Sequence, residues 1–159
     1  QLTYQDGAQH VLLNGEDVSE AIRTPEISYY ASKVSAVPEV RRFLLETQRS
    51  MAKNSSILMD GRDIGTVILP DAPVKIFLTA SAQSRAERRY KELIEKGQQV
   101  TMDGILHDIN ERDRQDMTRA VAPLKQADDA VLLDTSSLTL EESIAAVLRI
   151  IREKTEEKA

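Results

Sequence analysis

Short apolar runs separated by turn signals open the chain. Residues 2–4 and 11–13 lie on either side of Asp6-Gly7, a pair that is typical of tight hairpin turns. We therefore expect two antiparallel strands here. A second turn is expected at Asn14-Gly15.

Two helices with apolar faces are predicted next. Thr24 is a suitable N-cap, and Pro25 suits the first helical position. The helix they begin has one apolar face, which is formed by Ile27, Tyr30, Ala31 and Val34. Because the residue before a proline avoids the helical region, Val37-Pro38 should interrupt it. A second helix is expected over 38–53, with a buried face of Val40, Phe43, Leu44 and Met51.

Strands and helices then alternate to the end of the chain. We expect strands at 57–59, 74–79 and 130–134. Helices are expected over 81–96, from about 101, and after a capping box at 139–142, the last with a buried face of Ile144, Val147, Leu148 and Ile151. This alternation predicts a parallel α/β sheet. Three strands and a hairpin are few for so many helices, so we expect further strands outside this sequence.

Composition narrows the class of protein. A length of 159 residues suits one domain, or a domain with a small insert. The net charge of −5 argues against broad binding to nucleic acid. No apolar stretch approaches the roughly 18 residues of a membrane span. The absence of cysteine rules out disulfides and thiolate metal sites and is compatible with a reducing cytoplasm.

A dense group of charges directly follows the predicted strand at 57–59. Asp60-Gly61-Arg62-Asp63 places two carboxylates and a guanidinium where a parallel sheet binds its ligands, beyond the carboxyl end of a strand. A solvated turn would explain Asp-Gly alone. The full run from Asp60 to Gly65 favours a binding site.

A second group of charges ends the helix that begins near 101. Arg112, Asp116 and Arg119 are spaced four and three apart, so one helical side should carry all three. They form either an ion-pair ladder or a clamp for an anion. Exposed ion pairs contribute only about 0–1 kcal/mol each, which is a weak reason to concentrate so many.

The remaining arginines do not by themselves indicate a binding site. Arg41 and Arg42 lie in the first turn of a helix, where a cation opposes the helix dipole, so we look for a compensating partner; the alternative is a surface arginine. On the helix over 81–96, Arg85, Arg88 and Arg89 are expected on a solvated face.

Four blocks of sequence together resemble bacterial cytidylate kinases. They occur in that family's order and nearly at its spacing, and they cover almost all of the chain. The blocks are Asn14-Gly15-Glu16-Asp17-Val18-Ser19 with Ile22-Arg23-Thr24, then residues 60–67 from Asp60 to Val67, then 71–78 from Asp71 to Leu78, and finally Arg112-Asp113 through Thr118-Arg119-Ala120-Val121-Ala122-Pro123-Leu124.

The resemblance implies a fold and an activity. The fold would be a P-loop nucleoside monophosphate kinase, with a parallel sheet flanked by helices and a small β insert. Residues 1–54 would form the monophosphate-binding insert, and 55–159 the core, with a mobile lid at about 97–122. The activity would be transfer of the ATP γ-phosphoryl to CMP or dCMP with Mg²⁺, by a cytoplasmic monomer that binds neither nucleic acid nor membrane.

The resemblance also implies roles for the residues that read the acceptor nucleoside. Ser32, Arg41 and Asp63 would face the cytosine ring. Arg112 and Asp116 would lie near the sugar.

Three residues are implied in catalysis. Arg62 and Arg119 would hold the acceptor phosphate, and Asp60 would help to hold the metal ion through water. Arginine is suited to this role because its planar fork grips phosphate through two hydrogen bonds.

One departure from the family pattern is clear. The phosphate-binding run Gly-x-x-x-x-Gly-Lys-[Ser/Thr] does not occur in these residues, and the chain opens inside a predicted strand without an initiator Met. We therefore expect the strand and P-loop to lie in an N-terminal portion outside this sequence, and this chain alone to lack turnover. The alternatives are a non-catalytic CMP-binding module and a kinase for another pyrimidine monophosphate.

Overall fold

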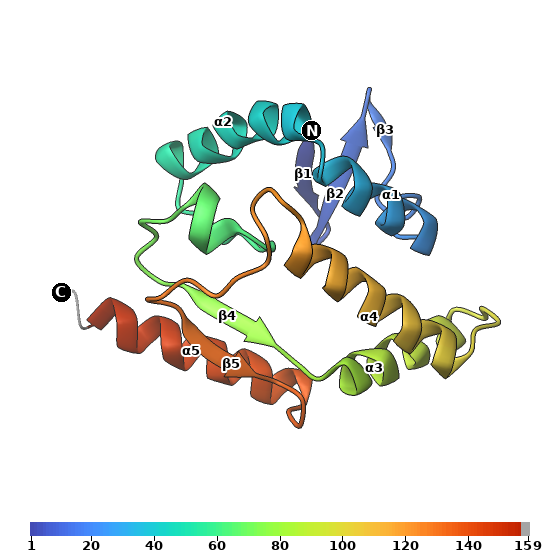
Figure 1. The fold of residues 1–159 in the computed structure, drawn as a ribbon. Helices are drawn as coiled ribbons and strands as arrows, with labels where there is room; N and C mark the ends of the chain where they lie inside the picture. The colour runs from blue at the N-terminus through green and yellow to red at the C-terminus, as the bar shows by residue number, and fades with distance from the viewer. Residues whose placement is uncertain (157–159) are drawn as a thin grey trace. The chain divides into compact units, whose positions relative to one another are not determined.

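The computed structural model describes residues 1–156, which form two compact units (Figure 1). The first unit is Gln1–Leu44 and the second begins at Leu45, inside helix α2 (Pro38–Asn54). Within residues 1–156 there is no helix both long and apolar enough to cross a membrane.

The first unit begins with an antiparallel sheet of three strands in the order β1-β2-β3, which are β1 (Leu2–Gln5), β2 (Ala8–Leu13) and β3 (Glu16–Asp17). The predicted hairpin and second turn are confirmed. Asp6-Gly7 and Asn14-Gly15 both have positive φ at both positions, which is the backbone of the two-residue turn that matches strand twist.

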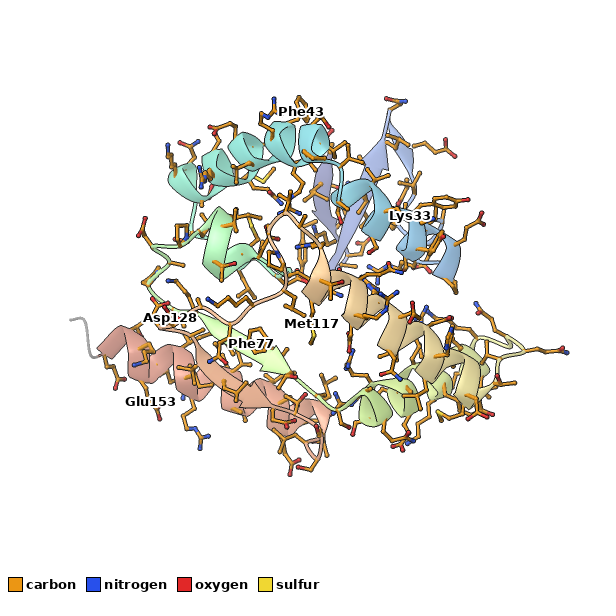
Figure 2. The ribbon with its side chains drawn as sticks, in the orientation of Figure 1. Lys33, Phe43, Phe77, Met117, Asp128 and Glu153 are labelled. Carbon is orange, nitrogen blue, oxygen red and sulfur yellow. The ribbon has the colours of Figure 1, made fainter. Side chains whose placement is uncertain are left out.

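The ends of helix α1 (Pro25–Ser35) and the start of α2 agree with the prediction. The Thr24 hydroxyl accepts a hydrogen bond from the Ile27 amide at 3.2 Å, and Pro25 is the first helical residue. The predicted burial of the apolar face of α2 is wrong. Neither helix contains a buried residue, and Phe43 on α2 is 77% exposed (Figure 2). Periodicity identifies an apolar face but not whether another surface covers it.

The second unit contains two parallel strands and three long helices. Strands β4 (Ile76–Thr79) and β5 (Val131–Asp134) pair along their whole length, with Ile76 opposite Val131. They confirm two of the predicted strands. The helices are α3 (Ala82–Glu95), α4 (Met102–Thr118) and α5 (Leu140–Glu156), and α5 lies along β5 (Figure 1). The mixed α/β class is thus observed, whereas the larger parallel sheet stays a prediction.

The strand predicted at 57–59 is absent from this unit. These residues form neither helix nor strand, and Leu58 is 93% exposed. A strand needs a neighbour for its backbone N–H and C=O groups, and local sequence does not supply one. A single π-helical turn, η1 (Ile64–Ile68), follows.

The apolar core of the second unit lies between α3 and α4. Ala86, Leu93 and Ile105 are buried there, with Tyr90 and Ile109 packed against them. The predicted ends of these helices are confirmed. The Thr101 hydroxyl accepts from the Gly104 amide at 3.2 Å, and Gly97 adopts the left-handed φ of 73° that favours glycine after a helix.

Helix α5 begins with the predicted capping box. The Thr139 amide donates to Glu142 at 2.8 Å, and the Glu142 amide donates to the Thr139 hydroxyl at 3.2 Å. Its buried face differs from the predicted one, because Ile150 is buried while Ile144 and Leu148 are exposed. Fraying was expected from Glu153 to Ala159; the helix continues to Glu156, and residues 157–159 lie outside the described residues.

Truncating a side chain in the core between α3 and α4 tests this description. Leu93 is 4% exposed, and its neighbour Ile94 is 45% exposed. Leu93→Ala should lower the free energy of unfolding by about 2–5 kcal/mol, because it leaves a cavity. Ile94→Ala should change it by roughly 0.5 kcal/mol. Denaturant unfolding of both variants measures the difference, and equal losses would contradict the assigned core.

Candidate anion-binding site

The first part of the site is the turn that precedes η1. The backbone carbonyl of Asp63 accepts hydrogen bonds from the amides of Val67 at 2.9 Å and Ile68 at 3.2 Å, which closes the π-helical turn. Arg49 on α2 donates to the carbonyls of the same two residues, at 2.9 Å and 3.1 Å. Arg49 therefore holds the C-terminal end of the turn, and Arg62 and Asp63 lie at its beginning.

The second part is the end of α4 and the loop that follows it. Arg119 lies just beyond the last helical residue. The chain then folds back, because the Leu124 amide donates to the Asp116 carbonyl at 2.8 Å and Arg119 Nε donates to the Ala122 carbonyl at 2.6 Å. Ala122 has a φ of 48°, a strained conformation for a residue with a Cβ. In this strained conformation, the Ala122 carbonyl faces the Arg119 guanidinium.

These two segments, more than 40 residues apart in sequence, meet around two carboxylates. Arg62 Nε lies 3.1 Å from Asp116 Oδ2. Arg119 lies 3.9 Å from Asp116 Oδ1 and 3.6 Å from Asp63 Oδ1. Asp63 and Asp116 are each only 6% exposed. The structure therefore brings Arg62, Asp63, Asp116 and Arg119 together, and Asp116 contacts both arginines.

Arg112 adds a third guanidinium beside this group. The pKa of Arg112 is lowered, first because nearby protein atoms remove part of its hydration and second because the positive charge of Arg62 is close; Asp116 and Asp113 oppose this shift. The Arg112 side chain nevertheless keeps much of its surface in contact with solvent. Because Asp113 is paired with Arg85, three guanidinium groups face the two buried carboxylates and leave an excess of positive charge, so the cluster attracts anions.

One donor in this cluster is unsatisfied. Arg119 Nη2 is buried and, among the described residues, has no hydrogen-bond partner. Its distance of 3.6 Å from Asp63 is too long for a hydrogen bond. A buried donor without a partner costs about 1–3 kcal/mol, and more when the group is charged. A small anion with several acceptor oxygens would satisfy Nη2, so the arrangement is suited to bind phosphate.

The other predicted site residues are placed as follows. Asp60 is exposed on the irregular segment before the turn. No group of three or more metal-ligating side chains occurs in the described part of the chain, and the role of Asp60 at a metal ion stays a prediction. Ser32 and Arg41 belong to the first unit, and their membership of the same site stays a prediction. Arg41 donates to the Ser35 carbonyl at 3.1 Å, which is the compensating partner expected at this helix start.

Sequence reasoning missed two arginines of α3. Arg85 forms a bidentate ion pair with Asp113 on α4, and Arg88 donates to the carbonyls of Thr135 and Leu138. Both were expected on a solvated face. Their partners are 28 to 50 residues away along the chain, so helical spacing carried no signal for these contacts.

A parallel strand pair with helices defines a mixed α/β protein. Together with an arginine cluster suited to phosphate, this fold is consistent with the nucleotide-kinase class, in which the protein positions charged phosphate groups. Sequence comparisons make the class specific. A sequence model of the family described as "Cytidylate kinase" matches residues 1–153.

Relatives carry the same description. Proteins named "Cytidylate kinase" from Thermosipho melanesiensis and Carboxydothermus hydrogenoformans are 53% and 49% identical over 96% and 95% of this chain, which covers 70% and 68% of their lengths. One from Caldicellulosiruptor saccharolyticus is 53% identical over 91% of this chain, which covers 64% of its length. This chain belongs to the cytidylate kinase family. Kinases are phosphotransferase enzymes, and the chain spans about two thirds of the length of these relatives.

The strained loop after α4 gives a test of the site's construction. Ala122→Val should lower the free energy of unfolding by about 1 kcal/mol or more, because a β-branched residue fits poorly at positive φ. Ala120→Val, at an exposed position two residues earlier, should change it by roughly 0.5 kcal/mol. Thermal unfolding compares the two. If the two substitutions lower the free energy of unfolding equally, the positive φ of Ala122 does not constrain the loop.

Proposed function

We propose that the protein containing this chain transfers the γ-phosphoryl group of ATP to CMP or dCMP and releases CDP or dCDP. In this proposal, residues 1–54 are the monophosphate-binding insert, 55–159 are the core, and about 97–122 form a lid. The observation that carries it is the convergence of Arg62 and Arg119 on Asp116, with a buried and unpartnered guanidinium nitrogen on Arg119. Family membership supports the choice of CMP.

Arg62 and Arg119 hold the acceptor phosphate. Phosphoryl transfer requires of the protein mainly positioning and stabilisation of charge. Each charge-assisted hydrogen bond from a guanidinium contributes about 1.5–3 kcal/mol. Arg119 lies at the end of the lid, so lid closure brings its charge to the transferring group as water is excluded, which strengthens the interaction.

Carboxylates and arginines near the acceptor phosphate are proposed to bind the base and the sugar of the nucleoside. Asp63, with Ser32 and Arg41, faces the cytosine ring, and Arg112 and Asp116 lie near the sugar. Cytosine presents an amino donor where uracil presents a carbonyl, so an acceptor at Asp63 favours cytosine. A carboxylate opposite the uracil oxygen should cost about 1–3 kcal/mol, which is roughly ten- to a hundredfold in affinity.

Asp60 is proposed to help hold Mg²⁺ through water. A single exposed carboxylate fits this ion, which keeps several waters and is bound by one or two carboxylates together with substrate phosphates. When bound, the ion neutralises charge on the donor phosphates. Asp60, Arg62 and Arg119 are thus the proposed catalytic residues.

The donor phosphates are proposed to be held by groups outside these residues. The sequence contains no Gly-x-x-x-x-Gly-Lys-[Ser/Thr] run, so it has no backbone cradle of that kind. We therefore expect this chain alone to show no turnover, while the complete gene product phosphorylates CMP as a cytoplasmic monomer without nucleic acid or membrane.

A non-catalytic CMP-binding module is the second candidate, and the missing glycine-rich run favours it. Calorimetry with CMP followed by an ATP turnover assay on the complete gene product separates the two. Binding without turnover in that product would favour the module.

Base selection is tested at Asp63. Asp63→Ala should reduce the preference for CMP over UMP by roughly ten- to a hundredfold in kcat/KM, because the acceptor that matches the cytosine amino group is gone. Steady-state kinetics of the complete gene product with both nucleotides measure it. Asp71→Ala, at an exposed carboxylate, is the control and should leave the preference unchanged. An unchanged preference in Asp63→Ala would favour a kinase for another pyrimidine monophosphate.

Arg119 is tested by comparing activity with stability. Arg119→Ala should reduce kcat/KM by roughly 10²–10³-fold, because a donor to the transferring group is lost. The midpoint temperature of thermal unfolding should fall far less, relative to the wild type, than kcat/KM does. Arg114→Ala is the matched control on α4, since Arg114 forms only an exposed pair with Glu111 at 2.9 Å. Equal losses of activity and stability in Arg119→Ala would indicate a structural ion-pair ladder.

A further inference from the structure

All three kinds of donor nitrogen on Arg85 are used in contacts that join separate elements. Nε donates to the Ala80 carbonyl at 3.1 Å. Nη1 and Nη2 donate to the two carboxylate oxygens of Asp113 at 3.0 Å and 2.6 Å. A bidentate pair of this kind fixes direction as well as distance, which a single-point contact does not.

These contacts join the end of strand β4 to the half of α4 that carries the anion site. Ala80 directly follows β4, and Arg85 lies in the first turns of α3. Asp113 follows Arg112 in sequence and precedes Asp116 by three residues, so it lies within one helical turn of both.

Apolar packing holds a different part of α4. The core between α3 and α4 uses Ile105, Leu106 and Ile109 of α4. Asp113 begins the next turn, so the Arg85 contact continues the attachment of α4 toward Asp116 after the apolar core has ended. Without it, the last turns of α4 lose their direct link to β4.

We propose that Arg85 is a positioning residue for the acceptor phosphate. It does not touch the anion cluster itself. By holding Asp113 against the end of β4, it sets the place of Arg112, Asp116 and Arg119 relative to Arg62. This inference rests on the proposed function, because the effect is expressed through the binding of CMP. Displacing a positioned charge by about 1 Å can cost on the order of a hundredfold in rate.

The experiment measures steady-state kinetics of the complete gene product with CMP and ATP varied separately. The variants are Arg85→Ala, Arg85→Lys, Asp113→Ala and the double variant Arg85→Ala with Asp113→Ala. Arg114→Ala is the control, because Arg114 is an arginine of α4 whose ion pair with Glu111 stays within that helix. Thermal unfolding is measured on every variant.

Arg85→Ala should raise the KM for CMP by about tenfold or more and lower kcat/KM by roughly ten- to a hundredfold, with the KM for ATP unchanged. The double variant should lose about as much as the worse single variant, since the two side chains act as one unit. Arg85→Lys should recover only part of the loss, because lysine cannot form the bidentate pair. Arg114→Ala should behave as the wild type.

Three outcomes would overturn the inference. An unchanged KM for CMP, with kcat falling only as far as the folded fraction falls, would make Arg85 merely structural. Additive losses in the double variant would show that Arg85 and Asp113 do not act together. If the wild-type protein does not phosphorylate CMP, the proposed function is wrong and this inference is wrong with it. If the wild type is active and Arg85→Ala has the same KM for CMP and the same kcat/KM, this inference alone is wrong.

Discussion

The site depends on one buried carboxylate, Asp116, that lies between Arg62 and Arg119. Three guanidinium groups could not gather in partly buried surroundings without acids between them, because each repels the others and each loses hydration. Asp116 and Asp63 offset most of that repulsion but not all of the charge. The remaining positive charge, together with an unsatisfied nitrogen on Arg119, gives the cluster its affinity for an anion.

Backbone contacts hold the cluster in place. Arg49 fixes the π-helical turn that presents Arg62 and Asp63, and the Leu124 amide fixes the carbonyl of Asp116. The positive φ of Ala122 turns a carbonyl toward Arg119 at the cost of local strain. Strain of this kind persists only where surrounding contacts require it, and here it lies beside the cluster proposed to bind the acceptor phosphate.

Much of this site could be anticipated from local patterns. The spacing of Arg112, Asp116 and Arg119 predicted a shared helical side, and the charges from Asp60 to Asp63 indicated a ligand site. The contacts between these two segments could not be anticipated, because no periodicity relates residues 54 positions apart. The same reason explains the misreading of Arg85 as a surface charge. The family resemblance, however, implied that Arg62 and Arg119 hold one phosphate, and so that the two segments meet.

The sequence by itself determined the local structure: both hairpin turns, the caps at Thr24, Thr101 and Thr139, and the strands β4 and β5. The turns and caps arise from φ preferences and from hydrogen bonds between residues a few positions apart, so nearby residues suffice to specify them. The apolar runs marked β4 and β5 as strands, but their pairing joins residues 55 positions apart. Only the tertiary structure decided which apolar faces are covered, that residues 57–59 remain unpaired, and which carboxylate each arginine meets. Those outcomes require a partner from elsewhere in the chain, and desolvation and pairing energies depend on that partner.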